Sequence, residues 1–174
     1  PNRFYQQVYF MTNNPTISAV GGLMRELYSS GGSIISAIRR VPLDAKTINS
    51  SAKSRNPINH PTVMFRKSVV IDSGNYQNCP FFEDYYLWAK ILTKGYLLSN
   101  LPEVLVETEV SSDYFRRRGG VTYVRNELHL VQELRKIGFL SPIEASIFML
   151  TRLPVRLVPV ALRQHLYRTF LRTN

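Results

Sequence analysis

The sequence has a single cysteine, Cys79, and no long apolar run. One cysteine excludes an internal disulfide framework and a zinc site built from several cysteines, and it favours a reducing compartment. No stretch approaches the roughly 18 consecutive apolar residues that a membrane-spanning helix requires, and no signal peptide is visible. Internal repeats and low-complexity segments are also absent from the sequence, so we expect an ordinary globular fold.

Acidic residues are scarce, since the chain has 12 Asp and Glu against 22 Lys and Arg and a formal net charge of +10. This balance favours an anionic partner: nucleic acid, a phosphorylated substrate or an acidic membrane surface. The hydrophobic fraction of 44% is sufficient for a core and excludes general disorder. Residues 115–174 contain 11 Lys or Arg and only 3 Glu, so most of the excess charge lies in this C-terminal part.

Helical patterns occur at both ends and in the middle of the chain. One helix is predicted at about residues 1–12, and because it begins at the first residue we expect the chain to be a piece of a longer protein. Another is predicted at about residues 83–93, closed by a lysine and a glycine. The stretch SPIE, from Ser141, has the pattern of a capping box. Pro154 and Pro159 are expected to break the helix that follows.

Extended patterns lie between these helices. A strand is predicted at residues 16–22 and is expected to end at its two glycines. Another is predicted at residues 62–65. Residues 96–110 read as two short strands, separated at residues 100–102 by a segment that contains proline.

Two adjacent acids, Glu83 and Asp84, stand at the start of the central helix, and two interpretations of them are open. Acids at a helix N-terminus interact favourably with the helix dipole and cap free amides, which needs no function. The same position is also a rigid platform that can hold a carboxylate at a cleft, where an aspartate can accept a proton from a hydroxyl group. The dipeptide alone does not distinguish the two.

The segments around this dipeptide resemble a known enzyme family. The blocks RNPINHPTVMFRKSVV, SGNY, FFEDYYLWAKILTKGY and NLPEVLVE occur in this order, and the series resembles the C-terminal, acceptor-side half of family 2 glycosyltransferases with the GT-A fold. It is most similar to bacterial enzymes that build exopolysaccharide and O-antigen. The resemblance implies an α/β, partial GT-A fold over residues 1–110, with a short mixed sheet and helices. Residues 111–174 would form a basic loop and a helical tail.

The resemblance also implies a chemistry. Asp84 would act as the catalytic base of an inverting hexosyl- or rhamnosyltransferase, and Glu83 would position the acceptor or hold Asp84 in place. The donor would be a nucleotide-diphospho-sugar and the acceptor a glycan or a lipid-linked sugar. A divalent metal, Mg or Mn, would be held by an Asp-x-Asp motif upstream, because no two aspartates here have that spacing. We therefore expect no metal in this chain alone, and no turnover by it.

Further candidates for substrate binding each have a structural alternative. His60 is expected either at the acceptor pocket or in an ordinary structural hydrogen bond. Arg116, Arg117 and Arg118 precede two glycines, so they are either a solvated charge run or a clamp for a diphosphate, to which arginine forks are suited. Trp88 is assigned to substrate binding as a cleft-wall residue, with the core as its alternative.

The tail mixes arginines with apolar residues from about residue 147 onward. Such a helix can lie in a membrane interface, or its apolar face can pack on the domain. With the resemblance, this favours a cytoplasmic protein at the inner face of a bacterial plasma membrane. The rivals are a non-enzymatic basic module that binds nucleic acid or membrane, and a catalytically dead homologue. No recognised nucleic-acid motif supports the former.

Overall fold

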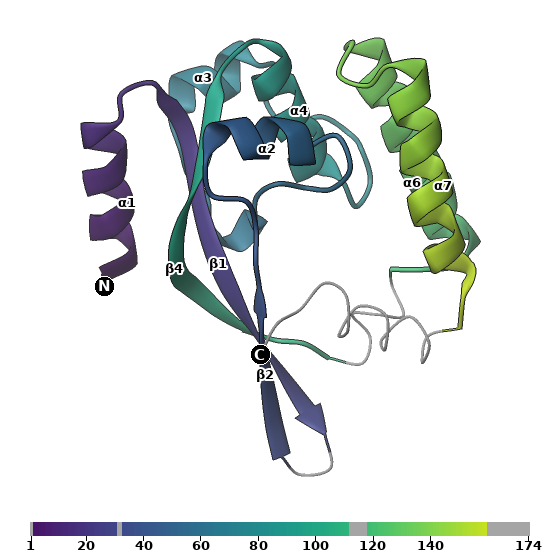
Figure 1. The fold of residues 1–174 in the computed structure, drawn as a ribbon, viewed down its shortest axis with the longest axis horizontal. Coiled ribbons are helices and arrows are strands. Elements are labelled where there is room, and N and C mark those ends of the chain that lie inside the picture. Colours follow the sequence, from purple (N-terminus) through teal and green to yellow (C-terminus); the bar gives the residue numbers. More distant parts are fainter. Residues whose placement is uncertain (1, 31–32, 112–117, 160–174) are drawn as a thin grey trace.

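The computed structural model describes residues 2–30, 33–111 and 118–159. Within them the chain is an α/β fold with a four-stranded mixed sheet, as expected (Figure 1). The strands are β1 Ile17–Ser30, β2 Ser33–Arg39, β3 Met64–Phe65 and β4 Leu97–Glu109. The described helices are α1 Asn2–Asn13, α2 Ala45–Ser51, α3 Lys67–Asp72, α4 Glu83–Thr93, α6 Val121–Lys136 and α7 Pro142–Leu157, with a 3-10 helix η1 at His60–Thr62.

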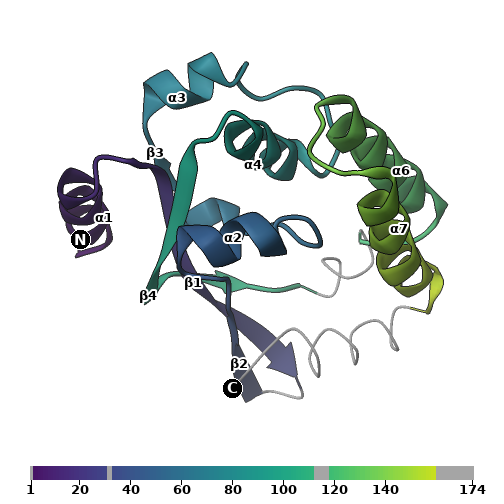
Figure 2. The same cartoon turned by 45° about the horizontal axis from the view of Figure 1, so that its top comes forward.

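Strand β1 is the centre of the sheet. Strand β4 pairs with it in parallel along one edge, and β2 and β3 pair with it antiparallel. Since β1 has only two edges and β4 occupies one over most of its length, β2 and β3 share the other. The β1–β2 pair extends away from the helices, and α1 lies on the opposite side of the sheet from the α6–α7 pair (Figures 1 and 2).

Two of the predicted strand boundaries are wrong. Strand β1 continues through Gly21 and Gly22 because the sheet leaves no room for a side chain there: a Cβ on Gly21 would lie 2.4 Å from the Asn100 side chain. Strand β4 likewise continues through Pro102. Its register against β1 shifts beside Gly22, and a bulge of this kind accommodates a proline, which cannot donate to the ladder.

Helix α4 has the predicted bounds and joins two parts of the core. Leu87, Trp88 and Ile91 pack with residues of the sheet and α2, while Tyr85 and Tyr86 pack with α6 and α7. A helix that is apolar around most of its circumference is expected to be buried. Burial on both sides fixes the first turn of α4 relative to the sheet and to the C-terminal helices.

The described part of the C-terminal segment packs on the rest of the chain. Helix α7 begins with the predicted capping box, in which Ser141 and Glu144 bond reciprocally. Leu130 and Phe148 contribute apolar side chains to the core cluster of α4. The expectation that Pro154 breaks the helix is wrong, because α7 continues to Leu157 with this proline inside it.

Membrane association was the other expectation for this segment. Among residues 2–30, 33–111 and 118–159, none of the helices combines the length and the apolarity needed to cross a bilayer. One face of α7 nevertheless exposes apolar side chains, namely Ile143, Ile147, Leu150 and Leu157. Residues 160–174, which contain the remaining arginines of the tail, lie outside the described part of the chain.

Candidate active site

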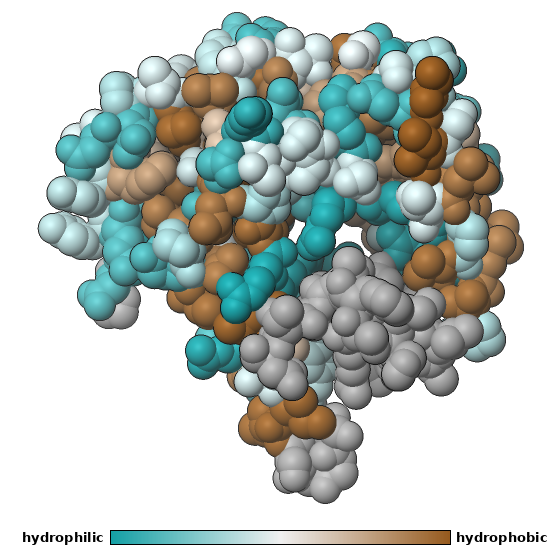
Figure 3. Space-filling model, viewed as in Figure 1, coloured by the Kyte–Doolittle hydropathy of each residue, from teal (hydrophilic) through white to brown (hydrophobic). Residues whose placement is uncertain are grey.

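A cavity of about 880 Å³ lies between the sheet, the first turn of α4 and the α6–α7 pair. Figure 3 shows a hollow in this face of the molecule, with hydrophilic residues along its upper border. The volume falls within the range of roughly 300–1,000 Å³ that is typical of sites for small molecules. The cavity therefore has the size of a substrate site.

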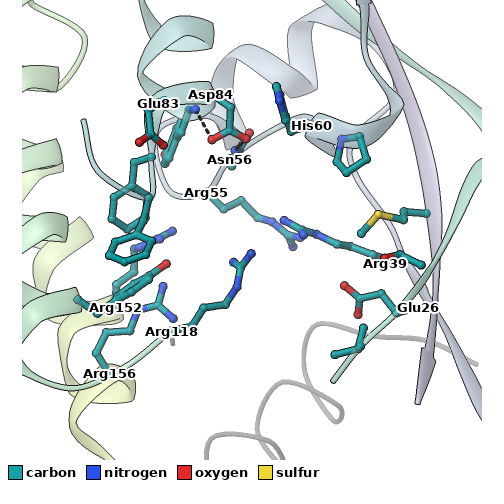
Figure 4. A pocket seen from close by; sticks show the side chains of 18 of the residues that line it. Glu26, Arg39, Arg55, Asn56, His60, Glu83, Asp84, Arg118, Arg152 and Arg156 are labelled. Carbon is teal, nitrogen blue, oxygen red and sulfur yellow. Dashed lines mark hydrogen bonds between the residues drawn. The ribbon is translucent and has the colours of Figure 1, made fainter. Parts of the chain in front are cut away.

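Asp84 lines this cavity from the first turn of α4 and is half-buried. Its Oδ2 accepts a hydrogen bond from Asn56 Nδ2 at 2.7 Å, and its Oδ1 accepts one from the Tyr85 backbone N–H at 2.8 Å (Figure 4). Asn56 lies on the loop after α2, 28 positions from Asp84, so this distant loop and the first turn of α4 together orient the carboxylate. A half-buried carboxylate at a cavity wall can in principle accept a proton from a ligand hydroxyl.

The turn that precedes Asp84 has an unusual backbone. Phe81 has a φ of 69°, in the left-handed region that residues with a side chain rarely adopt. Such a conformation costs on the order of 1–3 kcal/mol and persists only where the surroundings impose it, frequently at functional sites. Phe82, the residue that caps α4, is buried, whereas Phe81 is exposed and lines the cavity. The strained turn thus brings the acids of α4 to the cavity wall.

The structure brings the other acid and the histidine to the same cavity. Glu83 is exposed and lines it beside Asp84. His60 is also exposed and lines it, and its ring lies 6.1 Å from that of Tyr76 in an edge-to-face arrangement. Trp88 requires a correction, because its side chain is 0% exposed and packs in the core. The tryptophan supports the His60 ring from behind, with centroids 6.4 Å apart, and does not itself reach a substrate here.

The predicted arginine cluster is described only in part. Arg118 lines the cavity from the residues just before α6. Arg116 and Arg117 lie outside the described residues. The clamp formed by all three therefore stays a prediction.

Sequence reasoning missed several residues that line the same cavity. Those with polar or aromatic side chains include Arg39, Arg55, Asn56, Tyr76 and Arg152. They come from β2, from loops and from α7, so no local pattern relates them. Arg55 and Asn56 do fall within the block RNPINHPTVMFRKSVV, and this is the signal that could have identified them.

An ion cluster joins α6 to α7 at the wall of this cavity, which Arg152 and Arg156 line. Glu127 on α6 is 0% exposed, and Arg156 donates to its two carboxylate oxygens at 2.8 and 3.2 Å. Arg152 donates to Glu127 from Nε at 2.5 Å and to the Ser54 carbonyl oxygen at 3.1 Å. Burial alone would raise the pKa of Glu127, but the hydrogen bonds and charges of the two arginines outweigh it and hold that pKa below its usual value. The cluster ties the α6–α7 wall to the loop that carries Asn56.

Comparison with known proteins shows which proteins the chain is similar to. No protein-family model matches the chain. It is, however, 35% identical over 170 residues to the amylovoran biosynthesis glycosyltransferase AmsE of Erwinia amylovora, a match that covers 96% of this chain and 62% of the relative. It is also 36% identical over 172 residues to an uncharacterized glycosyltransferase of Haemophilus influenzae, covering 99% of this chain and 63% of the relative. These similarities support glycosyl transfer.

A third relative has a more specific name. The chain is 32% identical over 171 residues to the UDP-Gal:alpha-D-GlcNAc-diphosphoundecaprenol beta-1,3-galactosyltransferase of Escherichia coli, covering 98% of this chain and 62% of the relative. The chain thus spans less than two thirds of the length of the curated relatives it matches.

Proposed function

We propose that this chain is the acceptor-side part of an inverting glycosyltransferase of family 2 with the GT-A fold. The observation that carries the proposal is the half-buried Asp84 carboxylate, held by Asn56 at 2.7 Å on the wall of a cavity of about 880 Å³. The similarity of nearly the whole chain to glycosyltransferases supports the same class. A non-enzymatic nucleic-acid- or membrane-binding module is not favoured.

In the proposed reaction, Asp84 accepts the proton of an acceptor hydroxyl. The hydroxyl oxygen forms a bond to the anomeric carbon of the donor sugar as the bond from that carbon to the diphosphate oxygen breaks. The electron pair leaves with the nucleoside diphosphate, and the configuration at the anomeric carbon inverts. Glu83, beside Asp84 on the same turn, would orient the acceptor. His60 would contribute a further polar contact from η1.

The donor and a divalent metal belong to the proposal for the longer enzyme. In the part of the chain that the structure describes, no group of three or more His, Cys, Asp or Glu side chains could hold a metal ion. The Asp-x-Asp pair to which the resemblance assigns Mg or Mn does not occur in this sequence. We propose that such an ion and the nucleotide are held outside this chain, and we derive no step through them.

A position at a membrane surface is part of the proposal. One named relative acts on an acceptor attached to diphosphoundecaprenol. The exposed apolar side chains Ile143, Ile147 and Leu150 lie on the outer face of α7, while Arg152 of the same helix lines the cavity. Contact of the outer face with a bilayer would place the cavity close to a lipid-linked acceptor.

The test compares transfer rates in the full protein. Nucleotide sugars, beginning with UDP-galactose, are assayed with a lipid-linked N-acetylglucosaminyl diphosphate acceptor. Asp84→Asn is expected to lower kcat by about 100-fold or more, the contribution typical of a general base. Asp72→Asn is the matched control, because Asp72 is exposed and pairs with Lys94 outside the cavity. Unchanged transfer by Asp84→Asn would refute the base assignment.

A further inference from the structure

The turn that leads into α4 presents the ring of Phe81 to the cavity. Cys79 and Phe82 are both buried, and the Phe82 backbone N–H donates to the Cys79 carbonyl oxygen at 2.8 Å. Two buried residues thus anchor the turn at its ends. Phe81 lies between them, lines the cavity and is 53% exposed. The chain therefore turns an apolar ring outward at a place where both anchors are turned into the core.

A phenylalanine is an unexpected residue at this position of the turn. A hydrogen bond between residues three apart, with Pro80 second and a positive φ at the third residue, is the pattern of a type II turn. The third position of such a turn normally carries glycine or asparagine, because a side chain is strained at a φ such as the 69° of Phe81. The local backbone would favour another residue, so the gain from phenylalanine is to be sought in its ring.

The Phe81 ring is supported by a buried neighbour while much of it stays accessible. Its centroid lies 5.5 Å from that of Tyr123, with an angle of 32° between the two planes. Tyr123 is itself buried, so the Phe81 ring rests on the core. A support of this kind orders the ring before a ligand arrives, which lowers the entropic cost of binding.

The other aromatic side chains of the cavity are less available to a ligand. Among the described lining residues, Phe82, Tyr85 and Tyr123 are buried. Tyr76 and His60 are partly exposed, but their rings pack edge to face against each other with centroids 6.1 Å apart. Of the phenylalanine and tyrosine side chains that line the cavity in the described part of the chain, that of Phe81 is the most exposed.

We propose that Phe81 is a specificity-determining residue, against whose ring a pyranose ring of the acceptor stacks while Asp84 receives its hydroxyl group. The proposal rests on the proposed function, because the acceptor hydroxyl must reach Asp84, which lies three positions further along the chain and lines the same cavity. A pyranose exposes C–H groups on the faces of its ring. An aromatic face attracts such groups because it is apolar and carries partial negative charge. Stacking therefore selects a sugar and sets its plane relative to Asp84.

The base of the donor nucleotide is the other flat group that an aromatic ring can stack on. The position of Phe81 beside the proposed catalytic base favours the acceptor. NMR titration of the full protein separates the two sources without requiring turnover. Butyl N-acetyl-α-D-glucosaminyl diphosphate serves as the acceptor probe and UDP as the donor probe, both in the absence of metal ions.

The expected results follow from the position of the ring. Protons that lie over an aromatic face shift upfield, so the sugar ring protons of the acceptor probe should shift upfield on binding. Phe81→Leu should abolish this shift, weaken binding of the acceptor probe by about 3- to 10-fold and leave UDP binding unchanged. Phe81→Tyr, which retains the ring, should keep both the shift and the affinity. Phe4→Leu is the matched control, because Phe4 is an exposed phenylalanine on α1, outside the cavity.

Several outcomes would overturn the proposal. Absence of acceptor-probe binding, or of the upfield shift, in the unmodified protein refutes the stacking, and so does an equal affinity in Phe81→Leu and Phe4→Leu. A loss confined to UDP, or an equal loss for both probes, refutes the assignment to the acceptor. Thermal unfolding identifies a variant that does not fold. Phe81→Gly, which suits the third position of the turn, is then measured in place of Phe81→Leu, and an unaltered affinity overturns the proposal.

These outcomes are distinct from those of the Asp84 test. If transfer depends on Asp84 while Phe81→Leu binds the acceptor probe normally, the stacking is refuted and the base assignment stands. If Asp84→Asn leaves transfer unchanged while Phe81→Leu loses affinity for the acceptor probe, the base assignment fails and the stacking stands.

Discussion

The buried ion cluster between α6 and α7 makes a quantitative prediction about stability. In Glu127→Gln the two arginines lose their shared counter-charge. The Arg156 side chain is only 7% exposed, whereas that of Arg152 is 18% exposed and keeps some contact with water. Removal of one partner from a buried ion pair costs about 3–5 kcal/mol, and the partial exposure of Arg152 places our expectation near the lower end, about 3 kcal/mol. Equilibrium urea unfolding of the variant and the unmodified protein measures this difference.

The same prediction has a definite dependence on pH. The folded-state pKa of Glu127 is lowered from its ordinary value of 4.5. The ionised carboxylate therefore contributes stability that is fully present above the pKa of the unfolded state and is lost as the pH falls through the folded-state pKa. The difference between Glu127→Gln and the unmodified protein should be constant near pH 7 and should shrink below about pH 4.

Two comparisons decide whether the reasoning holds. Glu133→Gln removes a pair on the same helix with Lys136 at 2.6 Å, in which the lysine side chain is 69% exposed, and should cost less than about 1 kcal/mol. Replacement of Glu127 and Arg156 together by methionine should recover part of the loss, because the buried charge of Arg156 is removed together with its partner. A cost for Glu127→Gln no greater than that for Glu133→Gln, or a cost that grows as the pH falls, would refute the account.

Three further predictions concern the cavity wall and the core. Asn56→Ala removes the 2.7 Å hydrogen bond to Asp84 and should lower kcat of the full protein about tenfold with an unchanged donor KM, as expected when a reacting group loses its orientation; an unchanged kcat would contradict a positioning role. Gly21→Ala places a Cβ 2.4 Å from the Asn100 side chain and should lower the free energy of unfolding by about 1–3 kcal/mol, as for other overpacked cores; denaturant unfolding with no loss would contradict the close approach. Burial, followed by the nearby carboxylates, raises the pKa of the Cys79 thiol to about 12, so iodoacetamide at pH 8 should modify it only after unfolding, and rapid labelling of the folded protein would contradict the burial.

The success of the sequence analysis depended on how local the determining interactions are. Helix α4 was predicted with its bounds because an apolar segment, acids in the first turn and the Lys94–Gly95 end are all visible within a dozen positions. The predicted strand ended at residue 22, after its two glycines, because the sequence does not reveal that Asn100 approaches Gly21 from a strand far along the chain. Glycine is a turn signal when read locally and a packing residue when another segment occupies its side-chain space.

The residues of the candidate site were likewise predictable only where the signal is local in the sequence. Asp84 could be singled out because it stands beside Glu83 in a block that resembles an enzyme family. Asn56, its hydrogen-bond partner, is 28 positions away, and Arg39 reaches the cavity from β2. Neither has a local pattern that relates it to Asp84. The sequence therefore indicated the candidate carboxylate, whereas its contact with Asn56 and its shared cavity with Arg39 emerge from the fold.

Helix α4 lies between two parts of the core, and these two parts bear on different properties of the proposed enzyme: the transfer chemistry and the choice of acceptor. Leu87, Trp88 and Ile91 pack the helix against the sheet, and this contact contributes to the position of Asp84 relative to β1. The opposite wall of the cavity is held through a different contact, in which Glu127 joins α6 to α7. Substitutions of the α7 residues that line the cavity, such as Thr151 and Val155, should therefore reshape the space for the acceptor while Leu87, Trp88 and Ile91 keep α4 on the sheet. Relatives that share the first contact and differ in the second would retain the transfer chemistry and differ in the acceptor they accept.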